Sequence, residues 1–401
     1  MVCKRKLVIP SIVTGILAAM PGCDHSSSGK KEAAQKPFQP LALLPLAEYD
    51  GQIRHIVFHS AEGLVGPAWR SVYDLLNAMP EDTRFTFVCD TEKALTETQG
   101  RLRQWKFGDR QNITAHLIRQ PLSIWARDRY IAMKTTATGN LPTWLVPQVL
   151  QTFDRARRNR EREVPRLLNE ISPCCQIAET PLVLEGGNVM ASKQRVFIGA
   201  NALRENAPAG SPVDAGAALA ELFGLPVVLI RDDGGSPPIA HVDMYFTPIA
   251  DDHVLVGSPA LAATIMKQAD QASAGALKSR LFITPDVPNG IEASFSPERA
   301  ARFDQTARQL SEQGLRVTRI PYVDSRNGAF AVTYNNVIQE KRNGRHIVYM
   351  PIYKIPALDA AAKQAYESLG ITVKPIDVSP ICHLFGAVRC LANVVERASD
   401  E

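Results

Sequence analysis

The side chains best able to do chemistry stand in four short segments far apart in the sequence. They supply one thiol, one imidazole and three carboxylates, on Cys390, His241, Asp128, Glu185 and Asp243. A thiolate is a nucleophile, an imidazole moves protons near neutral pH, and a carboxylate pairs with a planar cation through parallel hydrogen bonds. This inventory suits attack on the central carbon of a guanidinium group.

Taken singly, most of these residues have a plainer interpretation. Asp128 precedes an expected strand, Tyr130–Lys134, where an aspartate is more often a turn or cap residue. Glu185 follows the expected strand Pro181–Leu184 and precedes two glycines, which indicate a tight turn or a close backbone approach. A cysteine such as Cys390 is more often a small buried hydrophobe than a nucleophile. No one of these segments is specific by itself.

The segment His241-Val242-Asp243 is more specific. In extended backbone, residues two apart project from the same face, so an imidazole and a carboxylate would enter one pocket. A zinc site could use this pair, but no third ligand stands at a supporting spacing, and no paired Cys-x-x-Cys spacing exists. We therefore favour acid–base chemistry for this segment.

Taken in order, the segments resemble the guanidine-modifying enzymes of the pentein fold, and most closely the agmatine deiminase and bacterial peptidylarginine deiminase family. The resemblance covers nearly all of the expected domain. The matching segments are Leu46-Ala47-Glu48-Tyr49-Asp50, Trp125-Ala126-Arg127-Asp128, Leu184-Glu185-Gly186-Gly187-Asn188, His241-Val242-Asp243, Thr333-Tyr334-Asn335-Asn336 and Cys390.

Two departures from the family pattern bear on the substrate. The family usually carries Gly-Pro after the Asp128 motif, where this chain has Tyr130-Ile131. The Gly-rich run and histidine that precede the family's nucleophile are reduced here to Phe385-Gly386-Ala387-Val388-Arg389. Both segments affect the choice of substrate more than the chemistry.

The resemblance implies a role for each site residue. Cys390 would be the nucleophile that forms a thiouronium intermediate, and His241 would protonate the departing ammonia and then activate water. Glu185 would orient and stabilise the imidazole. Asp128 and Asp243 would hold the guanidinium from opposite edges, with Trp125 also in the substrate site. No metal and no organic cofactor would be required.

These roles predict a hydrolytic deiminase that acts on a small guanidino compound or an arginyl peptide. We expect agmatine or peptidyl-arginine to be preferred over free arginine; Arg127, Arg129 and Arg389 are the candidates for binding a substrate carboxylate. An amidinotransferase or a dimethylarginine hydrolase on the same scaffold is the first alternative. A non-catalytic, surface-anchored pentein binding module is the second.

Strand-length apolar runs alternate with helical periodicity, which indicates an α/β or α+β domain without the strict alternation of a doubly wound sheet. The resemblance implies five ββαβ modules around a pseudo-fivefold axis. Helices are expected over Ala68–Met79, Glu92–Trp105, Val213–Phe223, Pro259–Ala272, Pro297–Gln313 and Leu358–Leu369. Strands are expected over Ile53–Phe58, Phe85–Cys89, Ile113–Ile118, Trp144–Val149, Arg195–Gly199, Val227–Ile230, Val254–Gly257, Leu315–Ile320, His346–Met350 and Ile371–Ile376.

The first residues predict export. The cationic segment Lys4–Lys6 precedes the largely apolar run Leu7–Met20, and small residues then lead to Cys23. This is the layout of a secretory signal, too short for a comfortable membrane span. Cys23 resembles the lipidated first residue of bacterial lipoproteins. We expect a signal peptide over 1–22, a flexible tether over 23–44 and a single domain over 45–397. The alternative to lipid anchoring in the cell envelope is a soluble secreted or periplasmic protein.

Charge and cysteine content limit the partners. Loss of the signal would remove three cations and lower the formal net charge from +4 to +1. A near-neutral domain argues against nucleic acid, and membrane contact would come through the lipid alone. The segment Arg155–Arg166 interleaves arginines with acids, so we expect a solvated helix face with paired charges. An odd number of cysteines remains (Cys89, Cys174, Cys175, Cys382, Cys390), which leaves at least one thiol free.

Overall fold

The structure is a computed structural model of the chain. It describes residues 43–63, 65–135, 141–150, 155–207, 214–281, 293–325 and 330–398. The expected signal peptide, the lipidated Cys23 and most of the tether lie outside these residues. The first strand begins at Leu43, so the folded unit includes two residues assigned to the tether. All the described residues belong to one compact unit.

Among the described residues, the strands form five sheets. The five sheets have the strand orders β1-β5-β6-β7, β10-β9-β8, β11-β12-β14-β13, β16-β17-β18 and β19-β2-β3-β4. The strands are β1 (Leu43–Pro45), β2 (Gln52–Ser60), β3 (Arg84–Cys89), β4 (Ile113–Leu117), β5 (Ile131–Thr135), β6 (Thr143–Gln148), β7 (Gln176–Val183), β8 (Val189–Ala191), β9 (Val196–Gly199), β10 (Val227–Ile230), β11 (Phe246–Pro248), β12 (His253–Ser258), β13 (Ala293–Ser294), β14 (Arg316–Ser325), β15 (Ala331–Thr333), β16 (Ile338–Arg342), β17 (Arg345–Ile352), β18 (Thr372–Asp377) and β19 (Ala392–Ala398).

Every sheet repeats one pattern, an antiparallel pair followed by a strand parallel to its second member. The triplets are β19-β2-β3, β5-β6-β7, β8-β9-β10, β11-β12-β14 and β16-β17-β18. The chain passes through at least one helix before the parallel strand, as a parallel pairing requires. The expected five ββαβ modules are therefore confirmed.

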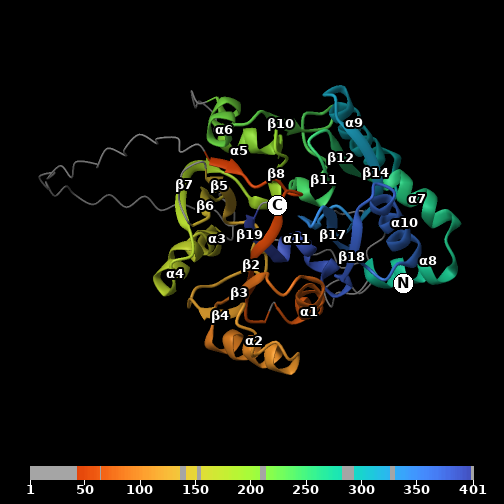
Figure 1. Cartoon of the computed structure of the whole chain (residues 1–401). Coiled ribbons are helices and arrows are strands. Elements are labelled where there is room, and N and C mark those ends of the chain that lie inside the picture. The colour runs from red at the N-terminus through yellow and green to blue at the C-terminus, as the bar shows by residue number, and fades with distance from the viewer. Residues whose placement is uncertain are drawn as a thin grey trace, which may run out of the picture. The chain divides into compact units, whose positions relative to one another are not determined.

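One module is built from both ends of the domain. The C-terminal strand β19 pairs antiparallel with β2, with Ala392 opposite Phe58 and Ala398 opposite Gln52. In Figure 1 α2, α4, α6, α7 and α9 lie at the periphery, whereas β8, β19 and α11 lie near the centre. The segment just before β19, which carries Cys390, is thereby held at the centre of the five sheets.

Local sequence signals set the helix ends. Ser296 and Ser258 each precede a proline and cap α9 and α7 by accepting a backbone N–H bond, and Gly224 ends α6 with φ 59°. The α-helices are α1 (Trp69–Ala78), α2 (Glu92–Gln104), α3 (Arg155–Glu161), α4 (Val164–Ile171), α5 (Asn201–Asn206), α6 (Ala215–Phe223), α7 (Pro259–Gln268), α8 (Gln271–Leu281), α9 (Pro297–Glu312), α10 (Pro356–Glu367) and α11 (Val388–Leu391).

The helix expected over Pro259–Ala272 is wrong in one respect, because the structure divides it into α7 and α8. Asp270 accepts a hydrogen bond from the backbone of Ser273 at 2.8 Å and so starts a new helix. An aspartate competes for backbone N–H groups and favours helix starts over helix interiors, which explains the break.

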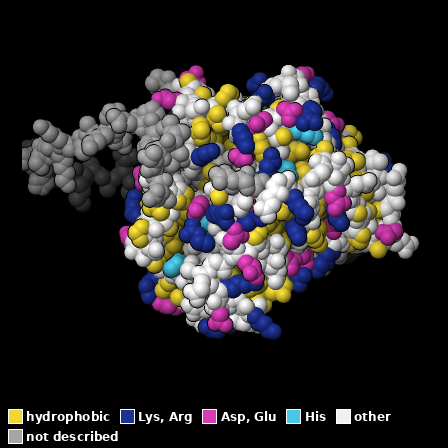
Figure 2. Space-filling model, in the orientation of Figure 1, with side chains coloured by type: hydrophobic (Ala, Val, Ile, Leu, Met, Phe, Trp, Pro, Cys, Tyr) yellow, Lys and Arg dark blue, Asp and Glu magenta, His cyan; other side chains and the backbone are white. Residues whose placement is uncertain are grey.

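Lys and Arg side chains are interspersed with Asp and Glu side chains over the face in Figure 2. Among the described residues, no helix combines the length and the apolar character needed to cross a bilayer.

Candidate active site

Cys390 lies on the short turn α11, next to the central strand β19. Its side chain is 4% exposed. Burial raises the pKa of the Cys390 thiol well above its ordinary value, and the negative charges of Asp243 and Asp128 raise it further. The sulfur is therefore a protonated thiol at neutral pH, and positive charge brought to these carboxylates would favour its ionisation.

Glu185 and His241 form a hydrogen-bonded pair. Glu185 Oε2 lies 2.7 Å from His241 Nε2, and His241 Nδ1 lies 4.0 Å from Asp128 Oδ1. Burial lowers the pKa of His241, but the hydrogen bond to Glu185 and the charges of Asp128, Glu185 and Asp243 outweigh it and raise this pKa to about 9. The imidazole is therefore protonated at neutral pH, as a general acid must be.

The second oxygen of Glu185 is held by two arginines. Arg129 Nη1 donates to Glu185 Oε1 at 2.6 Å, and Arg158 from α3 donates to the same oxygen. Burial raises the pKa of Glu185, but the hydrogen bond and charge of His241, followed by these arginines, lower it far below its ordinary value. Glu185 therefore stays ionised and holds the imidazole in one orientation.

The contact of Arg158 corrects an expectation about the basic segment 155–166. The exposed pair Arg166–Glu163 fits a solvated helix face. Glu161, however, is fully buried and accepts a hydrogen bond from Arg129 Nε at 2.9 Å. The expectation is therefore wrong for Arg158 and Glu161, because burial of the Arg129–Glu185 pair requires further charged partners.

Asp128 and Asp243 are 7% and 0% exposed. Within the described part of the chain, neither Asp128 Oδ1 nor Asp243 Oδ1 has a hydrogen-bond partner. Burial raises the pKa of both carboxyl groups; the charge of His241 opposes this at Asp128, and that of Arg389 opposes it at Asp243. Since a buried carboxylate oxygen without a donor is costly, the pair is suited to N–H donors of a cation.

The segment 241–243 reaches the site by a different backbone from the one expected. His241 is extended, but Val242–Met244 form a 3-10 turn in which Tyr245 N–H donates to the carbonyl of Val242 at 3.1 Å. The expectation of a continuous extended segment is wrong, because these hydrogen bonds compete successfully with strand pairing. The turn still brings His241 to Glu185 and Asp243 to Arg389.

The two glycines after Glu185 permit close approach. A Cβ atom on Gly186 would lie 1.9 Å from the carbonyl oxygen of Arg127, and one on Gly187 would lie 2.5 Å from His241 Nδ1. The sequence predicted a tight turn or a close approach, and the structure shows both: Gly186–Asn188 form a 3-10 turn, and each glycine is closely approached.

Trp125 lies against the loop that leads to the thiol. A Cβ atom on Gly386 would lie 2.5 Å from the ring atoms Cη2 and Cζ3 of Trp125. The ring also packs against the apolar cluster that contains Cys390. The indole therefore contacts the surroundings of the thiol, and its place in the substrate site stays a prediction.

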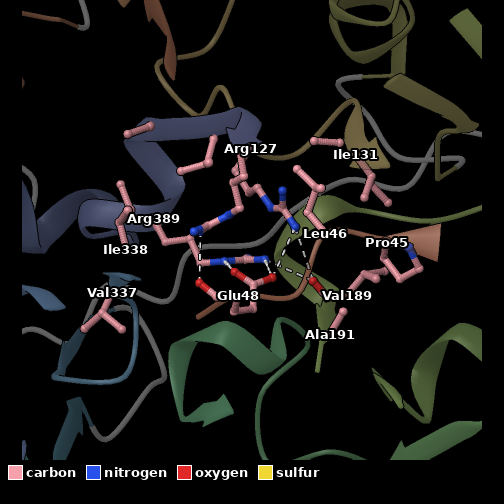
Figure 3. A pocket seen from close by; sticks show the side chains of 14 residues that line it. Pro45, Leu46, Glu48, Arg127, Ile131, Val189, Ala191, Val337, Ile338 and Arg389 are labelled. Carbon is pink, nitrogen blue, oxygen red and sulfur yellow. Dashed lines mark hydrogen bonds and ion pairs between the residues drawn. The ribbon is translucent and has the colours of Figure 1, made fainter. Parts of the chain in front are cut away.

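Arg389, which precedes the thiol in sequence, is paired inside the protein. It donates to Asp243 Oδ2 at 2.8 Å and to both carboxylate oxygens of Glu48, at 2.6 and 3.1 Å. Figure 3 shows Arg389, Glu48 and Arg127 among the residues that line a small pocket. Its volume is about 20 Å³, enough for one water molecule.

This pairing bears on the arginines expected to bind a substrate carboxylate. Arg127 donates to the carbonyl oxygen of Gly186 and to Asn393 Oδ1, both at 3.2 Å. Arg129 is paired with Glu161 and Glu185. Since Arg127, Arg129 and Arg389 are all buried with internal partners, the structure offers none of the three to a substrate carboxylate.

Sequence reasoning missed several neighbours of these groups. Asn336 was noticed only within a family motif, yet its Nδ2 atom lies 3.1 Å from Cys390 Sγ. Glu48 was likewise noticed only within a family motif, and Arg158 carries no local signal, because it acts through a partner distant in sequence. Among the described residues, no cluster of three or more His, Cys, Asp or Glu side chains could hold a metal ion. Cys89, Cys174, Cys175, Cys382 and Cys390 are all free thiols.

No protein-family model matches the chain, and no curated protein matches its sequence. Solved structures do match. The agmatine deiminase of C. jejuni superposes with a TM-score of 0.64 at 12% identity, over 90% of this chain and 97% of that one. The agmatine deiminase of Enterococcus faecalis gives 0.60 at 14% identity, over 89% and 97%. The domain thus has the pentein fold. More particularly, it has the fold of the agmatine deiminases, as the motif resemblance implied.

Proposed function

We propose that this protein is a hydrolytic deiminase that converts a terminal guanidine into a ureido group and ammonia. The observation that carries this proposal is the pair of buried carboxylates, Asp128 and Asp243, each with one oxygen that receives no hydrogen bond from the part of the chain that the structure describes. Both raise the pKa of the same buried thiol, Cys390. A flat, delocalised cation between them would satisfy both oxygens and bring its carbon to the sulfur.

Binding of the substrate activates the nucleophile in this proposal. The guanidinium charge offsets the two anions that raise the Cys390 pKa, so the thiol loses its proton to solvent. His241 is already protonated, since its pKa is about 9. The thiolate forms a bond to the guanidinium carbon, and the planar cation becomes a neutral tetrahedral adduct.

Proton transfer from His241 then drives the loss of ammonia. The imidazolium protonates one amino group of the adduct, the C–N bond breaks, and a thiouronium cation remains on Cys390. The neutral imidazole next takes a proton from water as the water oxygen attacks the same carbon. Collapse of this second adduct breaks the C–S bond while the hydroxyl proton leaves to solvent, which releases the neutral ureido product and returns the thiolate.

The internal pairing of Arg127, Arg129 and Arg389 favours a substrate without a free α-carboxylate near the guanidine. We therefore propose agmatine or peptidyl-arginine as the substrate class, ahead of free arginine. The solved structures of similar fold include agmatine deiminases and a candidate peptidyl-arginine deiminase.

The test is ammonia release from agmatine, free arginine and an arginyl peptide, compared side by side. We expect Cys390→Ser to abolish release, and Cys382→Ser, a change at another buried cysteine, to retain it. Faster turnover of free arginine than of the other two would overturn the substrate order. Amidino transfer to an added amine would favour an amidinotransferase, and a loss of methylamines from a methylated arginine would favour a dimethylarginine hydrolase. Binding without turnover of any guanidine would indicate a binding module.

We also propose export and lipid attachment at Cys23, on the strength of the N-terminal sequence. Incorporation of labelled fatty acid into the wild-type protein, and its loss in Cys23→Ser, tests the attachment. Wild-type protein that carries no labelled fatty acid and is found in the soluble periplasmic fraction would contradict lipid attachment.

A further inference from the structure

Two adjacent cysteines, Cys174 and Cys175, lie between the end of α4 and the start of β7. Asn169 Oδ1 accepts backbone N–H bonds from Cys174 at 2.9 Å and from Cys175 at 3.1 Å. The same oxygen lies 3.3 Å from Cys174 Sγ and 3.7 Å from Cys175 Sγ. One side chain therefore fixes the backbone of both cysteines, and both sulfurs lie against a single atom.

The two thiols differ in exposure and in acidity. Cys174 is partly exposed, whereas Cys175 is buried. A hydrogen bond from the Cys175 thiol lowers the pKa of the Cys174 thiol, and the positive charge of Arg84 lowers it further against the effect of burial. The hydrogen bond to Cys174, together with burial, raises the pKa of Cys175. Cys174 thus has the character of an attacking thiol, and Cys175 that of a resolving thiol.

Cys174 lines a pocket of about 400 Å³, together with His55 of β2, Arg84 and Thr86 of β3, and Thr114 of β4. His55 is 5% exposed, and its Nδ1 atom has no hydrogen-bond partner among the described residues. Burial lowers the pKa of His55 to about 3, so the ring is neutral. Because a buried polar atom without a partner is costly, the pocket is suited to a small polar molecule.

We propose that Cys174 and Cys175 form a second reactive site, a dithiol that a small hydroperoxide entering this pocket oxidises to a disulfide. None of the proposed catalytic residues lines the pocket. The inference therefore goes beyond the deiminase reaction and does not depend on it.

The reaction has two steps. The Cys174 thiolate attacks one oxygen of hydrogen peroxide, the O–O bond breaks, and Cys174 becomes a sulfenic acid. The departing hydroxide takes up the proton that the Cys174 thiol released. The Cys175 thiol then attacks the Cys174 sulfur, so that the S–S bond forms while the S–O bond breaks. The hydroxyl group leaves with the Cys175 proton as water. Two thiols are thus oxidised to one disulfide, and one peroxide is reduced to two waters.

The disulfide should be easy to reduce. Among the described residues every peptide bond is trans. Adjacent Cα atoms are then about 3.8 Å apart, whereas the Cα atoms of a disulfide are usually about 4.4–6.8 Å apart. A bond between Cys174 and Cys175 is therefore strained, and strained disulfides are the readily reduced ones. We expect a small thiol to restore the pair.

The first measurement treats the wild-type protein with hydrogen peroxide and follows its tryptic peptides by mass spectrometry. The peptide 167–193 contains Cys174, Cys175 and no other cysteine. It should lose the mass of two hydrogen atoms and regain it with dithiothreitol. Cys89 is the internal control, because it is fully buried and burial raises its pKa to about 11. Peptide 167–193 should be oxidised at least about tenfold faster than the peptide that contains Cys89.

Two variants test the separate roles of the thiols. Cys175→Ser lacks the resolving thiol and should accumulate a sulfenic acid on Cys174, which dimedone traps as an adduct of peptide 167–193. Cys174→Ser lacks the attacking thiol and should give no adduct on this peptide. Neither measurement uses a guanidine, so loss of ammonia release would sink the proposed function and leave this inference standing.

Three results would overturn the inference: a peptide 167–193 that is oxidised no faster than the Cys89 peptide, a disulfide that joins Cys174 to a second chain, or a dimedone adduct on Cys175 in Cys174→Ser. If either variant does not fold, as judged by its thermal transition, the mass change of the wild-type peptide decides.

Discussion

Arg389 donates to Asp243 Oδ2 across 2.8 Å, which ties the residue before the proposed nucleophile to one of the proposed substrate carboxylates. The same guanidinium donates a hydrogen bond to each carboxylate oxygen of Glu48. One oxygen of Asp243 is therefore occupied from within the protein, whereas its other oxygen receives no hydrogen bond from the described residues. The position of the thiol and the charge of Asp243 thus depend on one side chain.

Replacement of Arg389 by methionine should damage both stability and activity. Asp243 and Glu48 would lose the cation that donates hydrogen bonds to them, although Arg127 Nη2 stays 3.7 Å from Glu48 Oε1. We expect a cost of about 3–5 kcal/mol in the free energy of unfolding. We expect at least a hundredfold loss of kcat/KM. Urea denaturation and ammonia release measure the two effects. Arg316→Met is the control, because Arg316 makes the same two-pronged pair with Asp252 at an exposed site. It should cost under about 1 kcal/mol. Equal losses in both variants would contradict the prediction.

Glu185→Gln should move the alkaline limb of the pH–rate profile. The His241 pKa of about 9 depends on the negative charge of Glu185, so its removal lowers this pKa by about one unit or more. His241 then loses its proton at a lower pH, so the rate begins to fall at a lower pH than in the wild type. Glu179→Gln, at an exposed site in β7, should leave the limb in place. An alkaline limb that stays near pH 9 in Glu185→Gln would show that His241 does not set it.

The same raised pKa predicts a pH dependence of folding stability. Because His241 binds its proton more tightly when folded, its contribution is complete below its ordinary value of 6.5 and is lost as pH rises through about 9. Urea midpoints should therefore fall between these pH values in the wild type and fall less in His241→Asn. An equal fall in both would rule out this histidine as the cause.

Gly187→Ala should displace His241, since the added Cβ atom would lie 2.5 Å from Nδ1. We expect at least a hundredfold fall in kcat, because a catalytic group displaced by about 1 Å loses about that much. Gly275→Ala, where nothing lies within 4 Å, is the control and should be neutral or stabilising. Steady-state kinetics and thermal unfolding check both variants, and full activity in Gly187→Ala would count against the site geometry.

Asp128→Asn should separate thiol reactivity from turnover. Its negative charge raises the Cys390 pKa, so the variant should be alkylated faster at a fixed pH. The variant would also lack one of the two carboxylates that pair with the substrate guanidinium. Its kcat/KM should therefore fall about a thousandfold, equivalent to about 4 kcal/mol of transition-state stabilisation. The two rates must change in opposite directions. Parallel losses would indicate that Asp128 supports the fold instead.

Sequence reasoning recovered the strands and helices that depend on local signals. Apolar runs marked β2, β3, β9 and β12 because their buried residues adjoin one another in the chain. Ser296 and Gly314 marked the ends of α9 because caps act within one turn. Local patterns failed at Asp270 and at Val242–Met244, where side-chain capping and 3-10 hydrogen bonds competed with the expected element.

The residue types in the sequence determined which chemistry is available: one thiol, one imidazole and three carboxylates in a recognisable order. Only the tertiary structure decided how each is used. It assigned Arg389 to Asp243 and Glu48, Arg158 to Glu185, and Asn336 to the sulfur of Cys390. These pairings join residues far apart in the chain. Their free energies depend on burial and on distances that exist only once the five modules close, with β19 paired to β2.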